Sequence, residues 1–433
     1  MNGPRSTRRP ESEVTVAENY LSAERAAREL GVSTATLYAY VSRGLVRSET
    51  AAGNTRMRRY RTEDIEQLKA RKLARSDPAK IAAQTLQWGA PILDSAISLI
   101  SEGRIYYRGY DATELARTRD VEEVAALIWL GDFSHAGALF GAGGASRAPK
   151  IPAALKSTLA GPREQFQTAL VFAEAGDPAA YNFTVPTVAH TGARVLELLV
   201  STAIPRAARR GPLARRLQQG WAPDKAGAAR LINAALIFNA NNELSVSAFT
   251  ARCVASAGAT LYSVALAAFC AAQGSRTGGQ AERVEGFYDD VRKTRNARAI
   301  IAGRLRRGER IPGFGHPLFP QGDARARLLL DMTFDAYPRS PATAIVQSMI
   351  REVEAMAPEL HPNMYFARVT LAKVLGLSAD ASAWLSVLGN SIAWIGHAIE
   401  EYQLGRIIRP RARYTGPLPE SRRAAGDGKR VKA

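Results

Sequence analysis

Arg307-Gly-Glu-Arg-Ile-Pro-Gly-Phe-Gly-His316 is the stretch that decides the fold of this chain, and Asp323-Ala-Arg325 follows it closely. His316 stands between Gly315 and Pro317, where a backbone turn can present its imidazole. A lone histidine is more often structural, but the Gly-Phe-Gly-His context favours contact with a ligand. The turn therefore makes His316 the first candidate functional residue.

Length and composition indicate a multidomain globular protein. With 433 residues, two or three domains are expected. No apolar run approaches the roughly 18 residues that cross a bilayer, and the polar residues 1–13 do not resemble a secretory signal. Cys253 and Cys270 lie in one Ala-rich region and are expected to be buried and reduced. These features predict a cytoplasmic protein without membrane association.

The chain is strongly basic, with a net charge of +18. Such an excess favours anionic partners, namely nucleic acid, phosphates or carboxylates. An Arg-rich solvated surface explains the charge equally well, so the charge alone does not identify a partner.

Residues 17–73 have the pattern of a small helix-turn-helix domain. Ser22 and Ser33 are predicted to cap two short helices joined at Gly31, and a basic hairpin with a Gly53-Asn54 turn precedes a third helix. This order resembles the MerR/excisionase type of winged helix-turn-helix, in which the second helix enters the major groove and the wing follows phosphates. A helical cap that only packs on the rest of the chain is the alternative.

On this resemblance, two groups of residues are candidates to contact double-stranded DNA. Those of the second helix are Ser33, Thr34, Thr36, Tyr38 and Tyr40, and those that would neutralise phosphates are Arg43, Arg56, Arg58, Arg59 and Arg61.

The remaining chain is predicted to be helical between two polar ends. Residues 1–16 and the basic tail 417–433 are expected to be disordered, and residues 74–85 to form a linker. Long Ala- and Leu-rich segments between them favour an all-α body.

The body resembles citrate synthases at several ordered motifs. They are the Gly103–Leu115 segment GRIYYRGYDATEL, the Glu243–Arg252 segment ELSVSAFTAR, the Gly313–Arg325 block and the Ile408–Pro417 segment IRPRARYTGP. The resemblance implies an all-α, two-domain helical homodimer with its active site in a cleft. The expected large domain comprises residues 86–243 and 377–416, and the small domain residues 244–376.

The same resemblance implies a Claisen-type condensation between an acyl-CoA and a 2-oxo acid such as oxaloacetate. His316 matches the histidine that polarises the oxo acid carbonyl, and Arg325 matches an arginine that holds its carboxylate. Arg409 matches the arginine that the partner subunit donates, although it could equally be a solvated charge. Acyl-CoA would be a substrate or ligand rather than a permanently bound cofactor, and no metal site is expected.

Several positions depart from the family pattern. Asn242 stands where the resemblance expects an enolate-stabilising histidine, and Tyr365 stands where it expects the aspartate that acts as base. Asn242 still offers N–H donors, or it is a plain turn asparagine. Tyr365 is a weak base or an apolar wall. Thr277 replaces another family histidine, and Asn390 replaces a carboxylate-binding arginine.

Three functions remain open from the sequence. The chain is a condensing acyltransferase with an altered site, or a dimeric DNA-binding regulator that senses a carboxylate or acyl-CoA. It could also be a subunit that pairs with an intact synthase paralogue. The first two are not exclusive.

Overall fold

The structure is a computed structural model that describes residues 20–51, 54–62, 64–65, 68–69, 93–141, 161–204, 211–412 and 414–417. The chain divides into two compact units, Met1–Asp94 with Arg411–Ala433, and Ser95–Pro410. The segments predicted to be disordered (1–16) or a linker (74–85), and all of the predicted tail except Pro417, lie outside the described residues.

In its described residues, the N-terminal unit has helices α1 and α2 and a three-stranded antiparallel sheet in the strand order β1-β3-β2, and residues 62, 64–65 and 68–69 are helical. Its elements are β1 (Tyr20–Ser22), α1 (Ala23–Leu30), α2 (Thr34–Ser42), β2 (Ser48–Ala51) and β3 (Asn54–Arg61). The predicted caps form, since the Ser22 and Ser33 hydroxyls accept N–H groups of the first turns of α1 and α2. Gly31 ends α1 at a φ of +59°.

A small apolar core holds this unit together. It consists of Ala26, Ala27, Leu30, Leu37, Val46, Tyr60 and Ile65. Asp64 fastens the hairpin, because its carboxylate accepts the backbone N–H of Arg47 at 2.7 Å and two guanidinium N–H groups of Arg47 at 3.0 and 2.8 Å. The hydrogen bonds from Arg47 lower the pKa of Asp64 against the opposing effect of burial.

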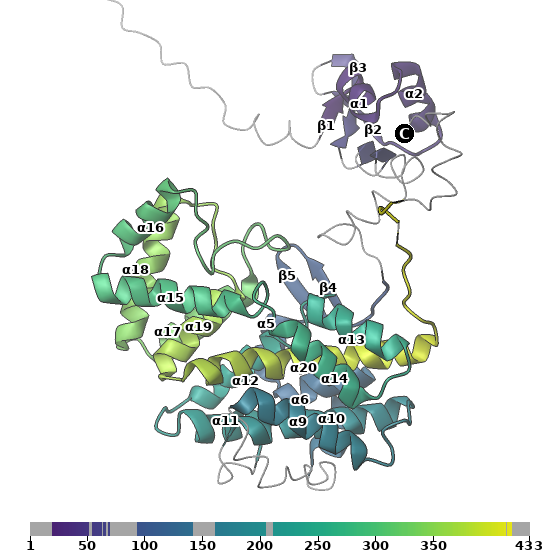
Figure 1. Cartoon of the computed structure of the whole chain (residues 1–433). Helices are drawn as coiled ribbons and strands as arrows, with labels where there is room; N and C mark the ends of the chain where they lie inside the picture. Colours follow the sequence, from purple (N-terminus) through teal and green to yellow (C-terminus); the bar gives the residue numbers. More distant parts are fainter. Residues whose placement is uncertain are drawn as a thin grey trace, which may run out of the picture. The chain divides into compact units, whose positions relative to one another are not determined.

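The second unit is a helical body with a small antiparallel sheet in the strand order β4-β5-β6 (Figure 1). Its strands are β4 (Ser98–Ser101), β5 (Arg104–Tyr107) and β6 (Tyr110–Asp111). Its first helices are α5 (Ala112–Thr118), α6 (Val121–Leu130), the short 3₁₀ helix η1 (Phe133–His135), α7 (Ala136–Phe140), α9 (Pro162–Ala175), α10 (Val185–Ala203), α11 (Leu213–Trp221) and α12 (Ala228–Phe238). The later helices are α13 (Val246–Ser256), α14 (Leu261–Ala272), α15 (Gly279–Thr294), α16 (Ala297–Arg306), α17 (Ala324–Ala336), α18 (Pro341–Met356), α19 (Met364–Leu375) and α20 (Ala379–Leu404).

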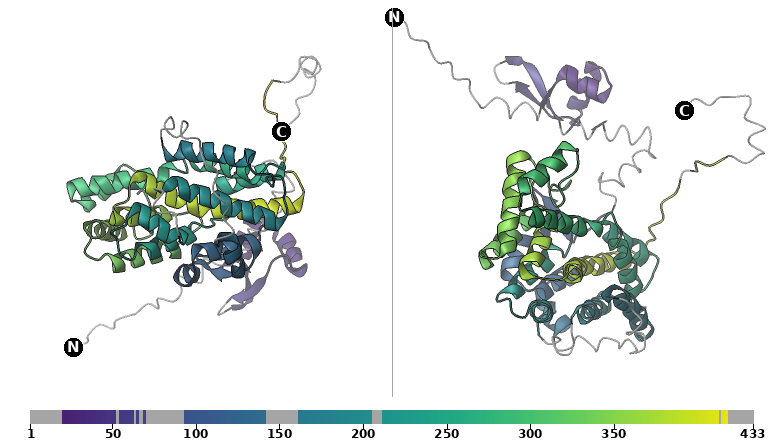
Figure 2. Two further views of the ribbon diagram at one scale, coloured as in Figure 1. Left: turned by 90° about the horizontal axis from the view of Figure 1, so that it is seen from below. Right: turned by 60° about the vertical axis from the view of Figure 1, so that its left-hand side comes forward.

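Helix α20 is the centre of the body. It packs against α6, α10, α12, α13 and α14, and the two views of Figure 2 show it surrounded by other helices. Glycines allow this close packing: a Cβ at Gly396 would lie 2.8 Å from the side chain of Ile128 on α6. Trp129 and Trp394 are each 1% exposed and contribute to the same core.

Helices α15 to α19 form a second group beside α20. Within it α17 and α15 pack on α19, and α16 packs on α18, while α19 also touches α20 (Figure 1). Helices α13 and α14 belong by sequence to the predicted small domain 244–376, but they pack on α20, and α14 also packs on α9. The division of the body into two domains stays a prediction.

The cysteines and the apolar helices bear on two sequence expectations. Cys253 and Cys270 are both free, but Cys270 is exposed and Cys253 only partly buried, so the expected burial of both was wrong. Over the residues that the structure describes, none of the helices is sufficiently long and apolar to traverse a bilayer.

Candidate active site

A turn fastened to the start of α19 carries His316. Gly313 and Gly315 adopt φ values of +82° and +74°, a region that glycine enters without steric cost. The Asn363 side-chain amide donates to the Gly315 carbonyl at 3.0 Å, and the Asn363 backbone N–H donates to the Gly313 carbonyl at 2.9 Å. The Asn363 side-chain oxygen also accepts the backbone N–H groups of Tyr365 and Phe366. Asn363 therefore holds the His316 turn and caps α19 together.

The partly buried imidazole of His316 has a defined tautomer. Its Nδ1 accepts the backbone N–H of Leu318 at 3.2 Å, so the proton of the neutral ring resides on Nε2. Burial lowers the pKa of His316, the Asp323 carboxylate partly offsets this, and Arg325 lowers the pKa further. The ring is neutral at pH 7 and carries an Nε2–H donor, the group that can polarise a carbonyl oxygen.

Arg325 is only 2% exposed, and its guanidinium is bound to other parts of the protein. Its Nε and Nη2 donate to the two carboxylate oxygens of Asp323 at 3.0 and 2.8 Å, and its Nη1 donates to the Phe238 carbonyl at 2.9 Å. Burial opposes the charged form, but the Asp323 carboxylate outweighs it and raises the pKa of Arg325. A ligand carboxylate would have to compete with Asp323, so the predicted carboxylate-binding role of Arg325 stays a prediction.

Asn242 connects Arg325 to α20. Its side-chain oxygen accepts Nη1 of Arg325 at 2.8 Å, and its Nδ2 donates to Oδ1 of Asn390 at 3.5 Å. The structure thus brings together three sequence-selected positions, Asn242, Arg325 and Asn390. The enolate contact predicted for Asn242 is untested.

Tyr365 lies in the first turn of α19 with Arg368 one turn later. The guanidinium carbon of Arg368 lies 5.2 Å from the centroid of the Tyr365 ring. Arg368 is 3% exposed, and its Nη1 donates to Oδ1 of Asn239 at 3.1 Å. Arg368 and Asn239 were not among the residues predicted from the sequence. The available signal was an arginine inside the apolar run Phe366–Leu371 at helical i+3 spacing from Tyr365.

Within one chain, Arg409 lies apart from Asn242, Arg325 and Asn390. It is exposed on the segment after α20, where the preceding Ile408 backbone N–H donates to Oγ of Ser256 at 3.0 Å. Ser256 ends α13, whereas Asn242 precedes the start of that helix, a separation of roughly 16 Å along its axis. The contribution of Arg409 across a dimer stays a prediction.

The residues predicted to contact DNA differ in exposure and in their contacts. Thr34, Tyr38, Arg43 and Arg58 are exposed, Tyr38 at 54%. Thr36 is partly buried, and its hydroxyl lies 2.9 Å from Oγ of the cap Ser33. Arg59 forms an ion pair with Glu49 at 3.5 Å and stacks over the Tyr20 ring at 4.3 Å. The side chain of Arg56 lies outside the described residues.

Comparison with known families assigns most of the chain. The family description "Citrate synthase, C-terminal domain" matches residues 86–411. The chain belongs to the citrate synthase family. The description "MerR HTH family regulatory protein" matches residues 21–77, so a MerR-type helix-turn-helix precedes the citrate synthase body.

Several citrate synthases are similar in sequence. The chain is 33% identical to citrate synthase 2 of Bacillus subtilis over 187 residues, which cover 43% of this chain and 50% of the relative. It is 26% identical to the citrate synthase of Haloferax volcanii over 359 residues, 76% of this chain and 94% of the relative. The alignment with the Bacillus protein thus spans about half of its length.

Solved citrate synthases share the fold of the body. The enzyme of Pyrobaculum aerophilum superposes with a TM-score of 0.66 at 23% identity, over 77% of this chain and 93% of that one. The enzyme of Thermotoga maritima gives a TM-score of 0.64 at 21% identity, over 76% and 95%. The predicted all-α fold with its N-terminal helix-turn-helix is confirmed.

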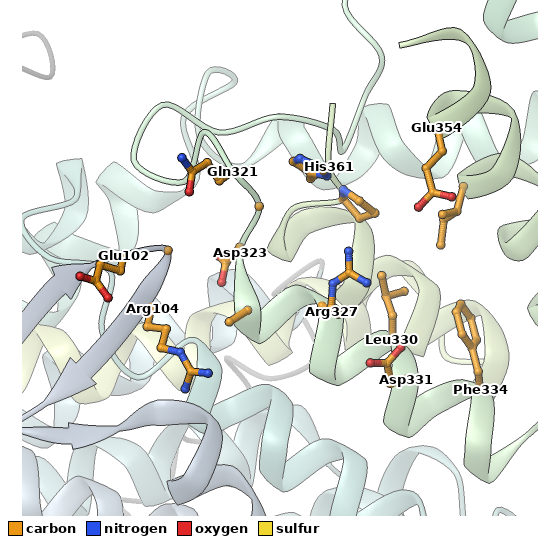
Figure 3. A pocket seen from close by; sticks show the side chains of 15 residues that line it. Glu102, Arg104, Gln321, Asp323, Arg327, Leu330, Asp331, Phe334, Glu354 and His361 are labelled. Carbon is orange, nitrogen blue, oxygen red and sulfur yellow. The ribbon is translucent and has the colours of Figure 1, made fainter. Parts of the chain in front are cut away.

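A cavity of about 360 Å³ borders the Asp323 side of this citrate synthase-type site (Figure 3). Its charged lining residues are Glu102, Arg104, Asp323, Arg327, Asp331 and Glu354. Arg104 is paired with Asp111 at 2.6 Å and Asp323 with Arg325. Of the other charged lining residues, Glu102, Asp331 and Glu354 are acidic and Arg327 is basic. Neither His316 nor Tyr365 lines this cavity. Among the described residues, no three His, Cys, Asp or Glu side chains are grouped as metal ligands.

Proposed function

We propose that this chain is a dimeric, cytoplasmic, MerR-type DNA-binding protein whose citrate synthase body binds a small carboxylate or an acyl-CoA as an effector. The observation that carries the proposal is that Asp323, the acidic residue that interacts with His316, is already bound by Arg325. Both oxygens of the Asp323 carboxylate accept hydrogen bonds from Arg325, and Tyr365 occupies the position expected for the catalytic base. The site therefore favours binding over condensation.

The chemistry at Tyr365 supports this preference. Tyr365 presents a hydroxyl where the family pattern expects a carboxylate, so the group that would accept the proton is missing. A body that binds its ligands without the fast proton abstraction is suited to sensing them.

The N-terminal unit supports the DNA-binding part. Its second helix exposes Thr34 and Tyr38, and its wing exposes Arg58, which is the arrangement expected for a groove-facing helix beside a phosphate-facing wing. A dimer of such units would bind a palindromic site.

A gel shift with DNA from upstream of the chain's own coding sequence tests the proposal. The protein should shift this DNA at low salt, and oxaloacetate, citrate or acetyl-CoA should change the affinity. Thr34→Ala with Tyr38→Ala should abolish sequence preference, while Arg230→Ala, a body variant outside the site, serves as control. A failure to shift any tested DNA at low salt would refute the DNA-binding role.

Condensation of an acyl-CoA with oxaloacetate is the second candidate, favoured by the neutral Nε2–H tautomer of His316. A structural relative from Thermoplasma acidophilum was solved as a ternary complex with carboxymethyl coenzyme A and oxaloacetate, at a TM-score of 0.64 and 18% identity. Thiol release from acetyl-CoA or propionyl-CoA in the presence of oxaloacetate measures this activity. A rate above that of His316→Ala would support the condensing function.

A further inference from the structure

Helix α19 contains a buried arginine in an otherwise apolar segment. Arg368 is 3% exposed, and its neighbours Ala367 and Val369 are each 1% exposed. Arginine is almost never fully buried unless its charge is paired. The position therefore requires a physical explanation.

The described residues supply Arg368 with neutral partners only. Its Nη1 donates to the amide oxygen of Asn239, its guanidinium lies over the Tyr365 ring, and its Nε has no hydrogen-bond acceptor. No carboxylate among the described residues forms an ion pair with it.

Other buried arginines of the body differ in this respect. Arg216, 5% exposed, donates to both oxygens of Glu197 at 2.7 Å, and its Nε also lacks an acceptor. Arg252 is paired with Glu401 at 2.7 Å, and Arg325 is paired with Asp323. The distinguishing property of Arg368 is thus the missing counter-charge rather than the open Nε.

A buried charge without a counter-ion is costly. Removing a guanidinium from water carries a desolvation penalty that a neutral amide and an aromatic face only partly offset. Burial accordingly lowers the pKa of Arg368, whereas the carboxylate partner of Arg325 raises that of Arg325. An arriving anion would remove this penalty, so the site is suited to bind one.

Arg368 lies among elements that also carry residues of the site. It shares a face of α19 with Tyr365, and its partner Asn239 follows α12 just before the loop that carries Asn242. Helix α20 approaches the same point, because a Cβ at Gly389 would lie 2.9 Å from the Leu236 carbonyl and clash with the Asn239 side chain. Asn390, the position where the family resemblance expects an arginine, is the next residue.

We propose that Arg368 is the residue that binds a carboxylate group of the ligand in this chain, in place of the arginine that the family pattern expects at Asn390. The inference deepens the proposed function, because it rests on a body that binds a small carboxylate. One guanidinium beside the neutral groups of Asn239 and Tyr365 balances a singly charged carboxylate. A phosphate of higher charge would remain uncompensated there.

Calorimetric titration with oxaloacetate and with citrate, combined with urea unfolding of the ligand-free protein, tests the assignment. Arg368→Met should lower carboxylate affinity at least 30-fold while leaving the urea midpoint equal to or above that of the wild type, because an uncompensated charge is removed. Arg216→Met is the matched control: it should lower the urea midpoint, because Glu197 loses its partner, and keep carboxylate affinity within about threefold.

A second variant keeps the proposal testable if Arg368→Met does not fold. Asn239→Asp places a carboxylate 3.1 Å from Nη1 of Arg368 and should exclude the added carboxylate. Asn233→Asp, at a buried α12 asparagine bonded to Val121 and Arg119, should leave carboxylate affinity unchanged. Unchanged affinity in both Arg368→Met and Asn239→Asp overturns the assignment, as does a wild type that binds neither carboxylate. Loss of DNA binding with carboxylate binding intact would instead overturn only the regulatory function.

Discussion

At the scale of single residues, a glycine turn carries His316, Arg325 is paired with Asp323, and Arg368 is buried beside neutral partners. The sequence of the turn was sufficient to select His316, because glycines and a histidine in this order have few alternative uses. It could not show that the Arg325 guanidinium donates to the Asp323 carboxylate. This pairing depends on the side-chain conformations of both residues, which the sequence does not reveal. The sequence prediction also missed Arg368, which is buried on α19, a helix that packs against several others.

His397 provides a pH-dependent term in stability. Burial, with a smaller effect of Arg252, lowers the pKa of His397 from 6.5 to about 4. Between pH 6.5 and 4, His397 is protonated in the unfolded chain but neutral in the folded chain. The free energy of unfolding therefore has its full value above about pH 6.5 and decreases as the pH falls toward 4. The loss should reach about 3 kcal/mol. Urea unfolding of wild type and His397→Gln between pH 7 and 4.5 measures it, and parallel curves for both proteins would contradict it.

Gly313 has a conformational and a packing requirement. At a φ of +82°, a Cβ would lie 2.8 Å from Cβ of Phe366 and 2.9 Å from Cγ2 of Val284. Gly313→Ala should therefore lower the free energy of unfolding by about 2–4 kcal/mol. Gly308→Ala is the control, because its φ of +67° is similar but no atom lies within 4 Å of the added Cβ. Chemical denaturation should show a loss of only about 1 kcal/mol there.

At the scale of elements, caps and apolar patterns predicted much of the fold. Ser22 and Ser33 begin α1 and α2 as expected, because a serine hydroxyl satisfies an N–H group at a helix start. The wing was harder to interpret. Arg58 and Arg59 are adjacent and equally basic in sequence, but the alternation of a strand exposes one and directs the other to Tyr20 and Glu49.

The Asn363 cap couples an element to the site. Its side chain accepts two N–H groups of α19 and donates to the Gly315 carbonyl of the His316 turn. Asn363→Ala should cost about 2–3 kcal/mol of stability and weaken carboxylate binding, because the turn loses its anchor. Ser378→Ala, at the exposed cap of α20, removes a single bond to Ala381 and should cost under about 1 kcal/mol without affecting binding. Equal losses in thermal denaturation would argue against the special role of Asn363.

At the scale of the whole molecule, the chain joins a MerR-type unit to a citrate synthase body and carries a net charge of +18. The ordered motifs of the body were sufficient to predict its fold, since they extend across most of the chain. The net charge does not reveal which arginines contact DNA, because arginines that form ion pairs within the protein count toward the total of Lys and Arg in the same way.

The salt dependence of DNA binding should separate these two kinds of arginine. Exposed Arg58 donates at 3.4 Å to Ser48 and is available to phosphate, so Arg58→Ala should reduce the slope of log affinity against log salt. The expected change is about 0.9 per subunit, or roughly 2 for a dimer on a palindrome, with an unchanged melting temperature.

Arg59→Ala should instead lower the stability of the N-terminal unit by about 1 kcal/mol through loss of the Glu49 and Tyr20 contacts. Its salt slope should stay near that of the wild type. Fluorescence anisotropy between 50 and 200 mM salt (the range over which roughly 10³-fold losses are typical) resolves the difference. If Arg59→Ala changes the slope and Arg58→Ala does not, the wing faces DNA through the opposite side of β3.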